Sequence, residues 1–568
     1  MEMIFYDFEV FKYDWVVVLK NTEDKSTIVI YNNSNKLKQF YEAHKNNIWC
    51  GFNSRHYDQY ILKAILCDMD PYEVSQFIVE KKQPGWKYSK LFMRIPFNNF
   101  DIMTDRYRGL KELEGFMGSN IKETSVPFDI DRPLTEQEIQ EVIEYCNHDV
   151  EQTMEVFLNR IEEFESHMGL IKMFKLPLSY IGKTKAQITA AILEAKKIDR
   201  NDEFDIQFPD TLRIEKYKHV LEWYKKPENR DYEKSLTTQI AGVEHVFAWG
   251  GLHGAIPNYQ GEGIFLSIDV ASYYPALMIE YGFLSRNVPN PDKYTQMRNE
   301  RLKLKAEKNP MQQPLKIVLN STYGAMKDKY NQLYDPRQAN NVCVAGQLLL
   351  LDLIEKLEGT CELIQSNTDG LIVKVNRRRH INRVKSICAE WEKRTRMILE
   401  FEEFSRIYQK DVNNYILVRS DGSYKSKGAY VKKLNNLDYD LPIVNKAIVN
   451  YFIHGIEPEV TIYNCNQLKE FQKIVKISNK YLYGLHGDKK LNEKVLRVFA
   501  SRRRSDPGVY KVKDENGKYR IEKIANTPER CFIENGDISN MEIPRKLDRK
   551  WYIETAWKRI KEFLGETE

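Results

Sequence analysis

The sequence predicts a multidomain protein that combines an α/β domain with a larger α+β region. Its 568 residues exceed what one hydrophobic core organises, so we expect about three or four domains. Strand-like and helix-like stretches alternate over residues 1–165, which is typical of an α/β domain. Later, a helical pair around residues 294–330 precedes paired strands around residues 363–375, which favours an α+β arrangement.

The composition is that of a folded, soluble chain, with 42% hydrophobic and 29% charged residues. No stretch approaches the roughly 18 to 20 consecutive apolar residues of a membrane span. The N-terminal stretch lacks the basic and apolar regions of a signal peptide. Eight cysteines without a CxxC pair argue against a zinc ribbon or a disulfide framework. We therefore expect a cytoplasmic protein without membrane association.

The net charge of +5 is too small to identify a partner. Three local basic runs are more informative, at residues 298–308, 376–380 and 501–506. Each alone fits a solvated face. Together they favour a polyanionic partner.

In the first 165 residues, β-branched and aromatic runs predict strands, and a 3.6-residue apolar period predicts helices. Thr135 and Glu138 are expected to form a capping box at the start of one long helix or a broken helix pair. The expected strands cover residues 3–20 (a pair), 26–32 and 46–53, and the expected helices cover residues 35–45, 57–66 and 134–164.

Residues 166–235 have a helical, highly charged pattern. Residues 261–282 then predict a strand that leads into a helix, and residues 294–330 a helical hairpin divided near Pro310 and Pro314. The remaining expectations are a strand–turn–strand at 363–375, a basic β segment at 413–433, a helix-like basic run at Arg502–Arg504 and a last helix over 548–564.

Acids in the N-terminal domain form the first candidate site. Asp7 and Glu9 are two residues apart on a predicted strand, so their side chains project from one face. Neighbouring carboxylates repel unless a cation lies between them, and divalent metal ions prefer oxygen ligands. Asp149 follows Tyr145 by four residues on a predicted helix, so both lie on one helix face. A D-x-E motif alone also fits ordinary surface charge.

The full order, D-x-E at 7–9, Asn53, Tyr57-Asp58 and Tyr145-x-x-x-Asp149, resembles the three motifs of the DEDD 3′→5′ exonucleases in their tyrosine variant. The spacing from Asn53 to Asp58 is slightly longer than the family pattern. The resemblance implies that Tyr145 positions a water and that Asn53 and Tyr57 contact a frayed single strand. It implies two metal ions, held by Asp7, Glu9, Asp58 and Asp149.

A second set of residues lies further along the chain. Asp269 ends an apolar strand before Ser272, Tyr274 and Pro275. Lys316, Asn320, Tyr323 and Gly324 have the spacing of one helix face. Asp369 lies in the turn Asn-Thr-Asp-Gly, which also fits an ordinary hairpin because Asn, Asp and Gly tolerate positive φ.

In this order the segments resemble the polymerase motifs of family B DNA polymerases of the small bacteriophage type: D-x-x-S-x-Y-P, K-x-x-x-N-S-x-Y-G and a D-T-D-type hairpin. The resemblance covers roughly residues 1–430. Residues 247–257 are similar to the Gly-Gly linker segment of such enzymes, and residues 413–433 to the segment that grips template–primer DNA.

The resemblance implies an RNase H-like exonuclease domain followed by a right-hand polymerase fold. The implied domains are exonuclease (1–165), helical linker and N-terminal polymerase segment (166–250), palm (251–290 and 331–430), fingers (291–330), and thumb with C-terminal region (431–568). The implied partners are primer–template DNA, dNTPs and phage replication proteins, with a monomer in the cytoplasm of an infected or host bacterium.

The resemblance also implies roles for individual residues. Asp269 and Asp369 hold two Mg²⁺ or Mn²⁺ ions, with Val270 as a further residue of the metal site. Lys316 lies along the triphosphate, and Arg301 (alternatively Arg298 or Lys305) assists Lys316 from the facing helix. Tyr274 lies beneath the incoming sugar and excludes a 2′-hydroxyl. Nucleotide-binding residues are Ser272, Tyr273, Tyr274, Arg301, Lys316, Asn320 and Tyr323; DNA-binding residues are Gly250, Gly251, Gly324, Thr368, Tyr415, Lys425 and Lys427, and Arg502–Arg504 are expected at duplex phosphates.

The chain departs from the family at two points. Family hairpins read Asp-Thr-Asp-Ser, whereas Asn367 and Gly370 stand here at the first and last positions. Only 47 positions separate Asp269 from Lys316 and 49 separate Asn320 from Asp369. These intervals leave no room for the insertions that protein-primed enzymes use for the priming protein and for strand displacement.

Two other functions stay open at this point. One is a 3′→5′ exonuclease whose polymerase half is weakened or inactive, as Asn367 suggests. The other is a non-catalytic DNA-binding replication factor, against which the complete acidic motifs argue.

Overall fold

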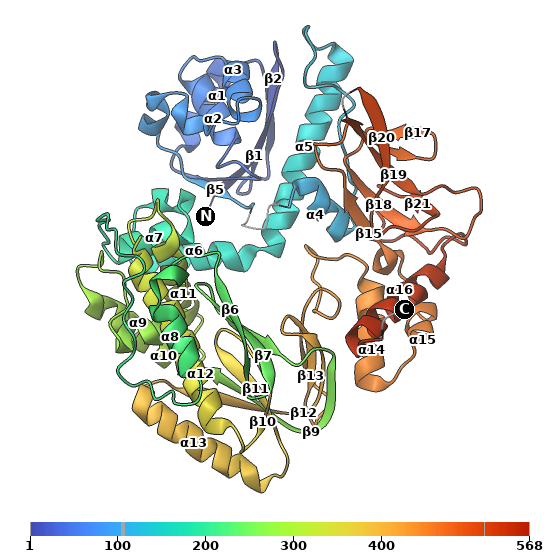
Figure 1. The fold of residues 1–568 in the computed structure, drawn as a ribbon. Helices are drawn as coiled ribbons and strands as arrows, with labels where there is room; N and C mark the ends of the chain where they lie inside the picture. Colours follow the sequence, from blue (N-terminus) through green and yellow to red (C-terminus); the bar gives the residue numbers. More distant parts are fainter. Residues whose placement is uncertain (1, 104–107, 516, 567–568) are drawn as a thin grey trace. The chain divides into compact units, whose positions relative to one another are not determined.

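The computed structural model describes residues 2–103, 108–515 and 517–566 (Figure 1). The chain forms two compact units, each built from several separate stretches. The first contains Met1–Lys183, Leu434–Val444 and Ile462–Ile553; the second contains Thr184–Lys433, Asn445–Thr461 and Glu554–Glu568. Within the described ranges, every helix is too short or too polar to cross a bilayer.

The first unit begins with a five-stranded sheet in the order β3-β2-β1-β4-β5. Antiparallel pairing joins β1, β2 and β3, whereas β1, β4 and β5 run parallel. The predicted α/β class of this region is thus confirmed. The strands are β1 (Met3–Val10), β2 (Trp15–Asn21), β3 (Thr27–Tyr31), β4 (Ile48–Gly51) and β5 (Asn99–Asp101).

Alternation along β1 determines what each face of this sheet covers. Ile4, Tyr6 and Phe8 pack in one apolar cluster with α1 (Ser34–His44), α2 (Asp58–Leu66) and α3 (Pro71–Val79). Met3 and Phe5 pack on the opposite face, with α4, α5 and α6. Because side chains alternate with a period of two, Asp7 and Glu9 share this second face.

The helices of this second face are α4 (Leu110–Met117), α5 (Glu136–Asn159) and α6 (Ile161–Met173). The chain breaks its helix at Arg160, so the second of the two predicted alternatives, a broken helix pair, is confirmed. The Thr135–Glu138 capping box is present, with Glu138 N donating to Thr135 Oγ1 at 3.3 Å.

Residues 462–553 add two small antiparallel sheets to the first unit. Their orders are β15-β18-β21 and β17-β16-β19-β20. Arg502–Arg504 lie in the turn after β18, so the predicted helical run there is wrong. The strands are β15 (Lys473–Lys476), β16 (Tyr483–His486), β17 (Lys489–Leu491), β18 (Val495–Ala500), β19 (Val509–Glu515), β20 (Lys518–Lys523) and β21 (Cys531–Ile533).

The second unit is built on a nine-stranded antiparallel sheet in the order β14-β13-β12-β9-β11-β10-β8-β7-β6. Its central strands β9, β11 and β12 carry or border the second set of sequence motifs. The strands are β6 (Ser235–Ile240), β7 (Val243–Ala248), β8 (Leu252–Ala255), β9 (Tyr259–Val270), β10 (Glu362–Ser366), β11 (Gly370–Val375), β12 (Leu399–Asp411), β13 (Asn414–Val418) and β14 (Tyr424–Lys427).

Helices accompany this sheet, and the predicted helical hairpin appears as α10 and α11. Helix α12 is buried along almost its whole length and packs against α9, α11 and α13 (Figure 1). The helices are α7 (Lys185–Ile192), α8 (Lys218–Lys225), α9 (Tyr273–Glu280), α10 (Pro291–Ala306), α11 (Gln312–Lys327), α12 (Pro336–Leu357), α13 (Arg379–Thr395), α14 (Pro442–His454), α15 (Pro458–Tyr463) and α16 (Arg549–Leu564).

Residues 196–216 contain no helix or strand, which corrects part of the predicted helical region. Side chains of α12 satisfy their backbone instead. Gln207 N donates to Asn341 Oδ1 at 2.7 Å and Arg213 N donates to Asp352 Oδ2 at 2.6 Å. These residues do not form a helix despite their helical propensity. Their backbone N–H groups donate instead to buried side-chain oxygens of α12.

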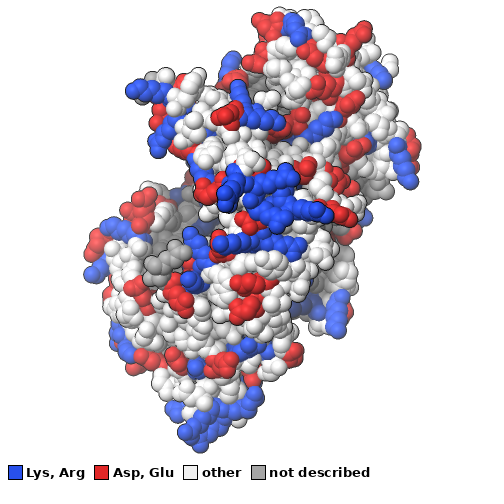
Figure 2. All heavy atoms as spheres, turned by 90° about the vertical axis from the view of Figure 1, so that its right-hand side faces the viewer, with Lys and Arg blue, Asp and Glu red and all other residues white. Residues whose placement is uncertain are grey.

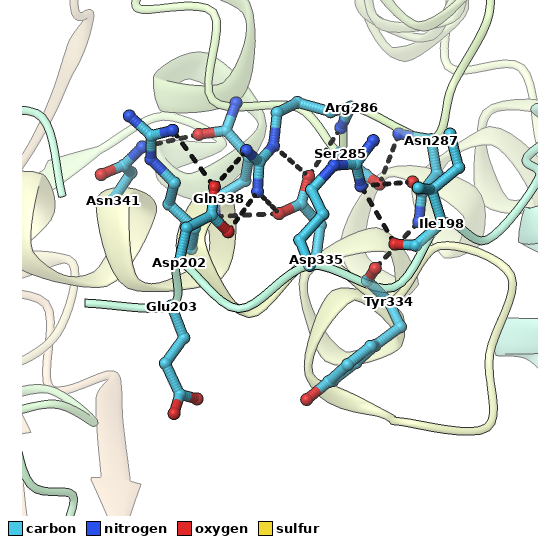
Figure 3. Close-up of polar contacts among 12 residues, drawn as sticks. Ile198, Asp202, Glu203, Ser285, Arg286, Asn287, Tyr334, Asp335, Gln338 and Asn341 are labelled. Atoms are coloured by element: carbon cyan, nitrogen blue, oxygen red, sulfur yellow. Dashed lines mark hydrogen bonds and ion pairs between the residues drawn. The ribbon is translucent and has the colours of Figure 1, made fainter. Parts of the chain in front are cut away.

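Arg286 fastens the start of this irregular stretch (Figure 3). Its guanidinium donates to Asp335 at 2.7 and 3.0 Å and to Asp202 at 2.6 and 3.0 Å. Its backbone N–H also donates to Asp335, whose side chain is fully buried. Two carboxylates share one planar cation, so loss of Arg286 leaves Asp335 buried without its counter-charge.

We expect Arg286→Met to destabilise this region by about 3 kcal/mol, because it leaves the buried Asp335 carboxylate unpaired. Amide hydrogen exchange of residues 198–207 should accelerate correspondingly. Lys293→Met is the matched control, since Lys293 and Glu194 form an exposed pair worth under about 1 kcal/mol. Equal exchange rates in the two variants would contradict the role given to Arg286.

Candidate active sites

The first carboxylate site lies on the α5-covered face of the five-stranded sheet. One carboxylate oxygen each from Asp7, Glu9 and Asp149 lie within 4.8 Å of one another. Asp58 is the first residue of α2, and its Oδ1 accepts the backbone N–H of Phe8 at 3.1 Å. That hydrogen bond joins Asp58 to β1 at Phe8, the residue between Asp7 and Glu9. Three of the four acids named from the sequence therefore lie in one cluster, and Asp58 is near enough for its charge to act on Asp7.

Burial raises the pKa of Asp7 and Glu9 well above the ordinary range, and the neighbouring acids raise both further. Burial also raises the pKa of Asp58 to about 7. Burial raises the pKa of Asp149 to about 6, although Lys111 opposes the shift. A cluster of buried, mutually repelling carboxylates is the donor set that hard divalent cations prefer, so these residues fit such ions.

Lys111 on α4 is a part of this site that sequence patterns do not indicate. Its ammonium donates to Asp149 and, at 3.0 Å, to Glu114 Oε1, and lies 4.7 Å from the Tyr145 ring centroid. Glu114 is fully buried, and His148 Nε2 lies 3.5 Å from its Oε1. Lys111 thus orients Asp149, one of the acids predicted to bind metal, and packs on Tyr145, which is predicted to position water. The only signal in the sequence is that Lys111 and Glu114 are three residues apart, a spacing that lets them pair on a helix.

Arg497 on β18 stabilises the C-terminal end of α4 by hydrogen bonds. This arginine is fully buried, and its guanidinium donates to Ser119 O at 2.6 Å and Gly115 O at 3.2 Å at the end of α4. It also donates to Gly536 O at 2.6 Å. The last carbonyls of a helix carry partial negative charge, so a cation is stabilising there.

The loop before α2 carries Asn53 and Tyr57. Asn53 has a φ of 60°, a left-handed conformation that asparagine tolerates. Asp101, which the sequence did not single out, accepts the backbone N–H groups of Asn53 and Arg55 at 2.9 and 3.0 Å. The Tyr57 hydroxyl pairs with Ser75 Oγ of α3 at 2.8 Å. The loop is therefore fixed beside Asp58.

The second site lies where β9 ends next to the β10–β11 hairpin. Antiparallel pairing places Asp269 opposite Gly370, and Val270 N donates to Asp369 O at 2.8 Å. Asp269 accepts from Ser267 Oγ at 2.9 Å, and burial followed by the charge of Asp369 raises the pKa of Asp269. Asp369 itself is exposed at the turn. One carboxylate at a strand end and one in the adjoining turn, so placed, fit hard divalent cations.

The structure explains why asparagine stands at position 367 and glycine at position 370 of the turn. Asn367 Oδ1 accepts the N–H groups of Asp369 at 3.1 Å and Gly370 at 2.8 Å, so it closes the turn. A Cβ on Gly370 would lie 2.1 Å from Asp269 Oδ1. Glycine therefore leaves the space that the Asp269 carboxylate occupies.

Helices α9, α10 and α11 place the next group of predicted residues. The Tyr274 and Tyr323 rings lie 4.4 Å apart, and Arg301 Nη1 donates to Ser272 Oγ at 2.8 Å. Lys316, Asn320 and Gly324 are exposed along one face of α11. Tyr273 is different: its side chain is buried and its hydroxyl donates to Gly346 O at 2.7 Å, which leaves only its backbone for a ligand.

A pocket of about 840 Å³ opens beside Asp269. Tyr415, Lys425 and Lys427 from β13 and β14 line it, together with Asn367 and Gly370. Lys425 is paired with Glu402, which the sequence did not indicate and which also accepts from Arg419 at 2.6 Å. A Cβ on Gly251 would lie 3.4 Å from Thr368 Oγ1, so the Gly250–Gly251 segment borders the hairpin.

Comparisons with known proteins add little to this geometry. No protein-family model and no curated protein matches the sequence. Among solved structures, the family B DNA polymerase from the hyperthermophilic archaeon Pyrobaculum calidifontis is similar at a TM-score of 0.43 and 14% identity, over 100% of this chain and 78% of that chain. A TM-score of 0.43 is too low to establish a shared fold or function, so the function is inferred from the side chains of the two carboxylate sites.

Without divalent metal, we expect the first carboxylate site to cost stability as pH rises. Raised carboxyl pKa values mean that the folded state binds more protons than the unfolded chain between the ordinary 3.8 and the value of about 7 for Asp58. Stability therefore falls through this window. Mg²⁺ should raise Tm by about 5 °C at pH 8 and by much less at pH 5, in scanning calorimetry.

Replacing Asp7 and Glu9 by Asn and Gln should reduce both the pH-dependent loss and the Mg²⁺ effect. A Tm increment that is the same at both pH values would show that the carboxylates do not bind the ion.

We expect Gly370→Ala to lower Mn²⁺ affinity at the second site by about tenfold, because its Cβ would displace the Asp269 carboxylate. Electron paramagnetic resonance in an Asp7→Asn/Glu9→Gln background would isolate this site. Gly250→Ala is the matched control, since no atom lies within 4 Å of the Cβ position. Unchanged affinity in Gly370→Ala would refute the displacement.

Proposed function

We propose that this protein is a DNA-dependent DNA polymerase that proofreads with its own 3′→5′ exonuclease. The observation that carries the proposal is the pairing of β9 with β11, which puts Asp269 opposite Gly370, the residue after Asp369. The Tyr274–Tyr323 ring pair and the exposed Lys316 and Asn320 of α11 support it. The separate cluster around Asp7 and Asp149 supports a second, hydrolytic site. One chain thus carries two carboxylate sites suited to phosphoryl chemistry.

In both sites, Mg²⁺ or Mn²⁺ ions held by the carboxylates supply, when bound, charge neutralisation of phosphates and a lowered pKa of the attacking hydroxyl or water. In the polymerase site, Asp269 and Asp369 are the ligands. Lys316 binds the triphosphate and Arg301 supports it from α10. Tyr274 lies under the incoming sugar, where its ring excludes a 2′-hydroxyl and so selects dNTPs.

In the nuclease site, Asp7, Glu9, Asp58 and Asp149 are the ligands. Tyr145 orients the attacking water, and Lys111 packs on its ring while it holds Asp149. Asn53 and Tyr57 bind the frayed 3′ end.

The DNA is bound mainly through its phosphates, which suits an enzyme that must copy any sequence. On the face drawn in Figure 2, Lys and Arg side chains gather near the middle of the view. The C-terminal sheets carry exposed arginines at 502, 503, 504 and 530, which we assign to duplex phosphates. Replication of a bacteriophage genome in a bacterial cytoplasm, as a monomer and with phage partners, is the proposed setting.

The decisive experiment uses a labelled primer–template with Mg²⁺ and all four dNTPs. Wild type and Asp7→Ala should extend the primer, whereas Asp369→Ala should lose extension by roughly a thousandfold, because a metal ligand is removed. Without dNTPs, wild type and Asp369→Ala should shorten the strand and Asp7→Ala should not.

If wild type only shortens the primer even at high dNTP, the polymerase assignment is overturned and a nuclease remains. If it neither extends nor shortens any strand, both assignments are wrong.

A further inference from the structure

A basic, partly apolar surface lies beyond the carboxylates of the first unit, on the chain that follows α3. Two short 3₁₀ helices form it, Gly85–Lys87 and Lys90–Arg94. Trp86 is 54% exposed and Met93 74% exposed. We call this the Trp86 surface; it consists of Val79, Lys81, Lys82, Trp86, Lys87, Lys90, Leu91, Met93 and Arg94.

Buried aromatic side chains fix the backbone of the Trp86 surface. Gly85 is buried, and a Cβ there would lie 2.4 Å from the Tyr60 ring. Phe92 is 1% exposed, stacks on Tyr88 at 6.1 Å and packs 6.0 Å from Tyr60. Trp86 therefore projects from a short helix whose neighbours are fixed in the core. A ligand that binds such a preorganised side chain loses little ordering entropy.

The cations of the Trp86 surface outnumber its acids: the exposed Glu80 adjoins Lys81 in the sequence, and the Lys87 ammonium lies 5.6 Å from the centroid of the Trp86 ring. Lys81, Lys82, Lys87, Lys90 and Arg94 are all exposed, and no residue in the described part of the chain forms an ion pair with any of them. In a 3₁₀ helix, residues three apart eclipse one another. Hence Lys90 lies beside Met93, and Leu91 beside Arg94, so charge and apolar area alternate.

The surface is also close to the first carboxylate site. A Cβ on Gly85 would lie 3.0 Å from Ile78 Cδ1, and Ile78 lies about one turn after Ser75 on α3. Helix α3 packs against α2 (Figure 1), and its Ser75 pairs with Tyr57. A strand bound at Tyr57 therefore needs to run only along α3 to reach Trp86.

We propose that the Trp86 surface binds single-stranded DNA and holds the strand whose 3′ end lies at the first carboxylate site. This inference rests on the proposed nuclease function. An exposed indole stacks on any base, because every base has an aromatic face, and unpaired lysines attract phosphates. Neither contact reads sequence. The surface therefore lengthens the grip on a single strand without adding base preference.

The test measures binding of labelled oligothymidylates of about 5 and about 20 nucleotides by fluorescence anisotropy. The full chain carries Asp7→Asn so that the strand stays intact. Trp86→Ala/Lys87→Ala should weaken binding of the longer strand about tenfold, with a shallower salt dependence, and leave the shorter strand unchanged. The matched control is Lys518→Ala/Tyr519→Ala on β20, where Tyr519 is 69% exposed and neighbouring cations are paired with acids. It should leave both affinities unchanged.

Trp86→Phe/Lys87→Arg should restore most of the lost affinity, because it keeps a stacking ring and a charge. Unchanged binding of the longer strand by Trp86→Ala/Lys87→Ala, or an equal loss for both lengths, would overturn the inference. A misfolded variant is recognised separately: with Asp7 intact, a correctly folded variant should still trim the shorter strand at the wild-type rate. If wild type does not trim that strand, the nuclease proposal fails, while the length comparison still decides whether the surface binds DNA.

Discussion

Carboxylates that must lie close together and yet repel one another are the constraint on which this structure depends. At the first site, β1 brings Asp7 and Glu9 to one face, and α2 and α5 add Asp58 and Asp149. Only one cation of the described chain, Lys111, enters this cluster. The remaining repulsion is a cost that the apolar cores on both faces of the sheet must offset, and that a bound divalent ion removes.

The second site meets the same constraint with a different arrangement. Asp269 is half-buried at the end of a central strand, whereas Asp369 stays in solvent at the turn. Glycine at 370 leaves room for the Asp269 carboxylate, and the neutral side chain of Asn367 closes the turn. The hairpin thus carries less negative charge than a turn with two acids, and keeps a defined backbone.

Local patterns predicted the features that depend on local physics. The Thr135–Glu138 capping box, the helical pair α10–α11 and the alternation that sets Asp7 beside Glu9 follow from spacing alone. The helical pattern was misleading over residues 196–216, because Asn341 and Asp352 of a distant helix accept backbone N–H groups there. Lys111 and Asp101 could not be identified for the same reason. Their roles depend on contacts between residues far apart in the chain, which no spacing encodes.

The support of α4 by Arg497 has a consequence for biosynthesis. Residues 1–183 leave the ribosome long before residues 462–553, which belong to the same unit. At about 5–20 residues per second, this delay is roughly 20 to 70 s. During that time the helix end has no cation, and the apolar side of α4 that later packs on Ile474 stays uncovered. The first part of the chain to be made therefore stays incomplete until strands near the end of the sequence, in residues 462–553, have been made.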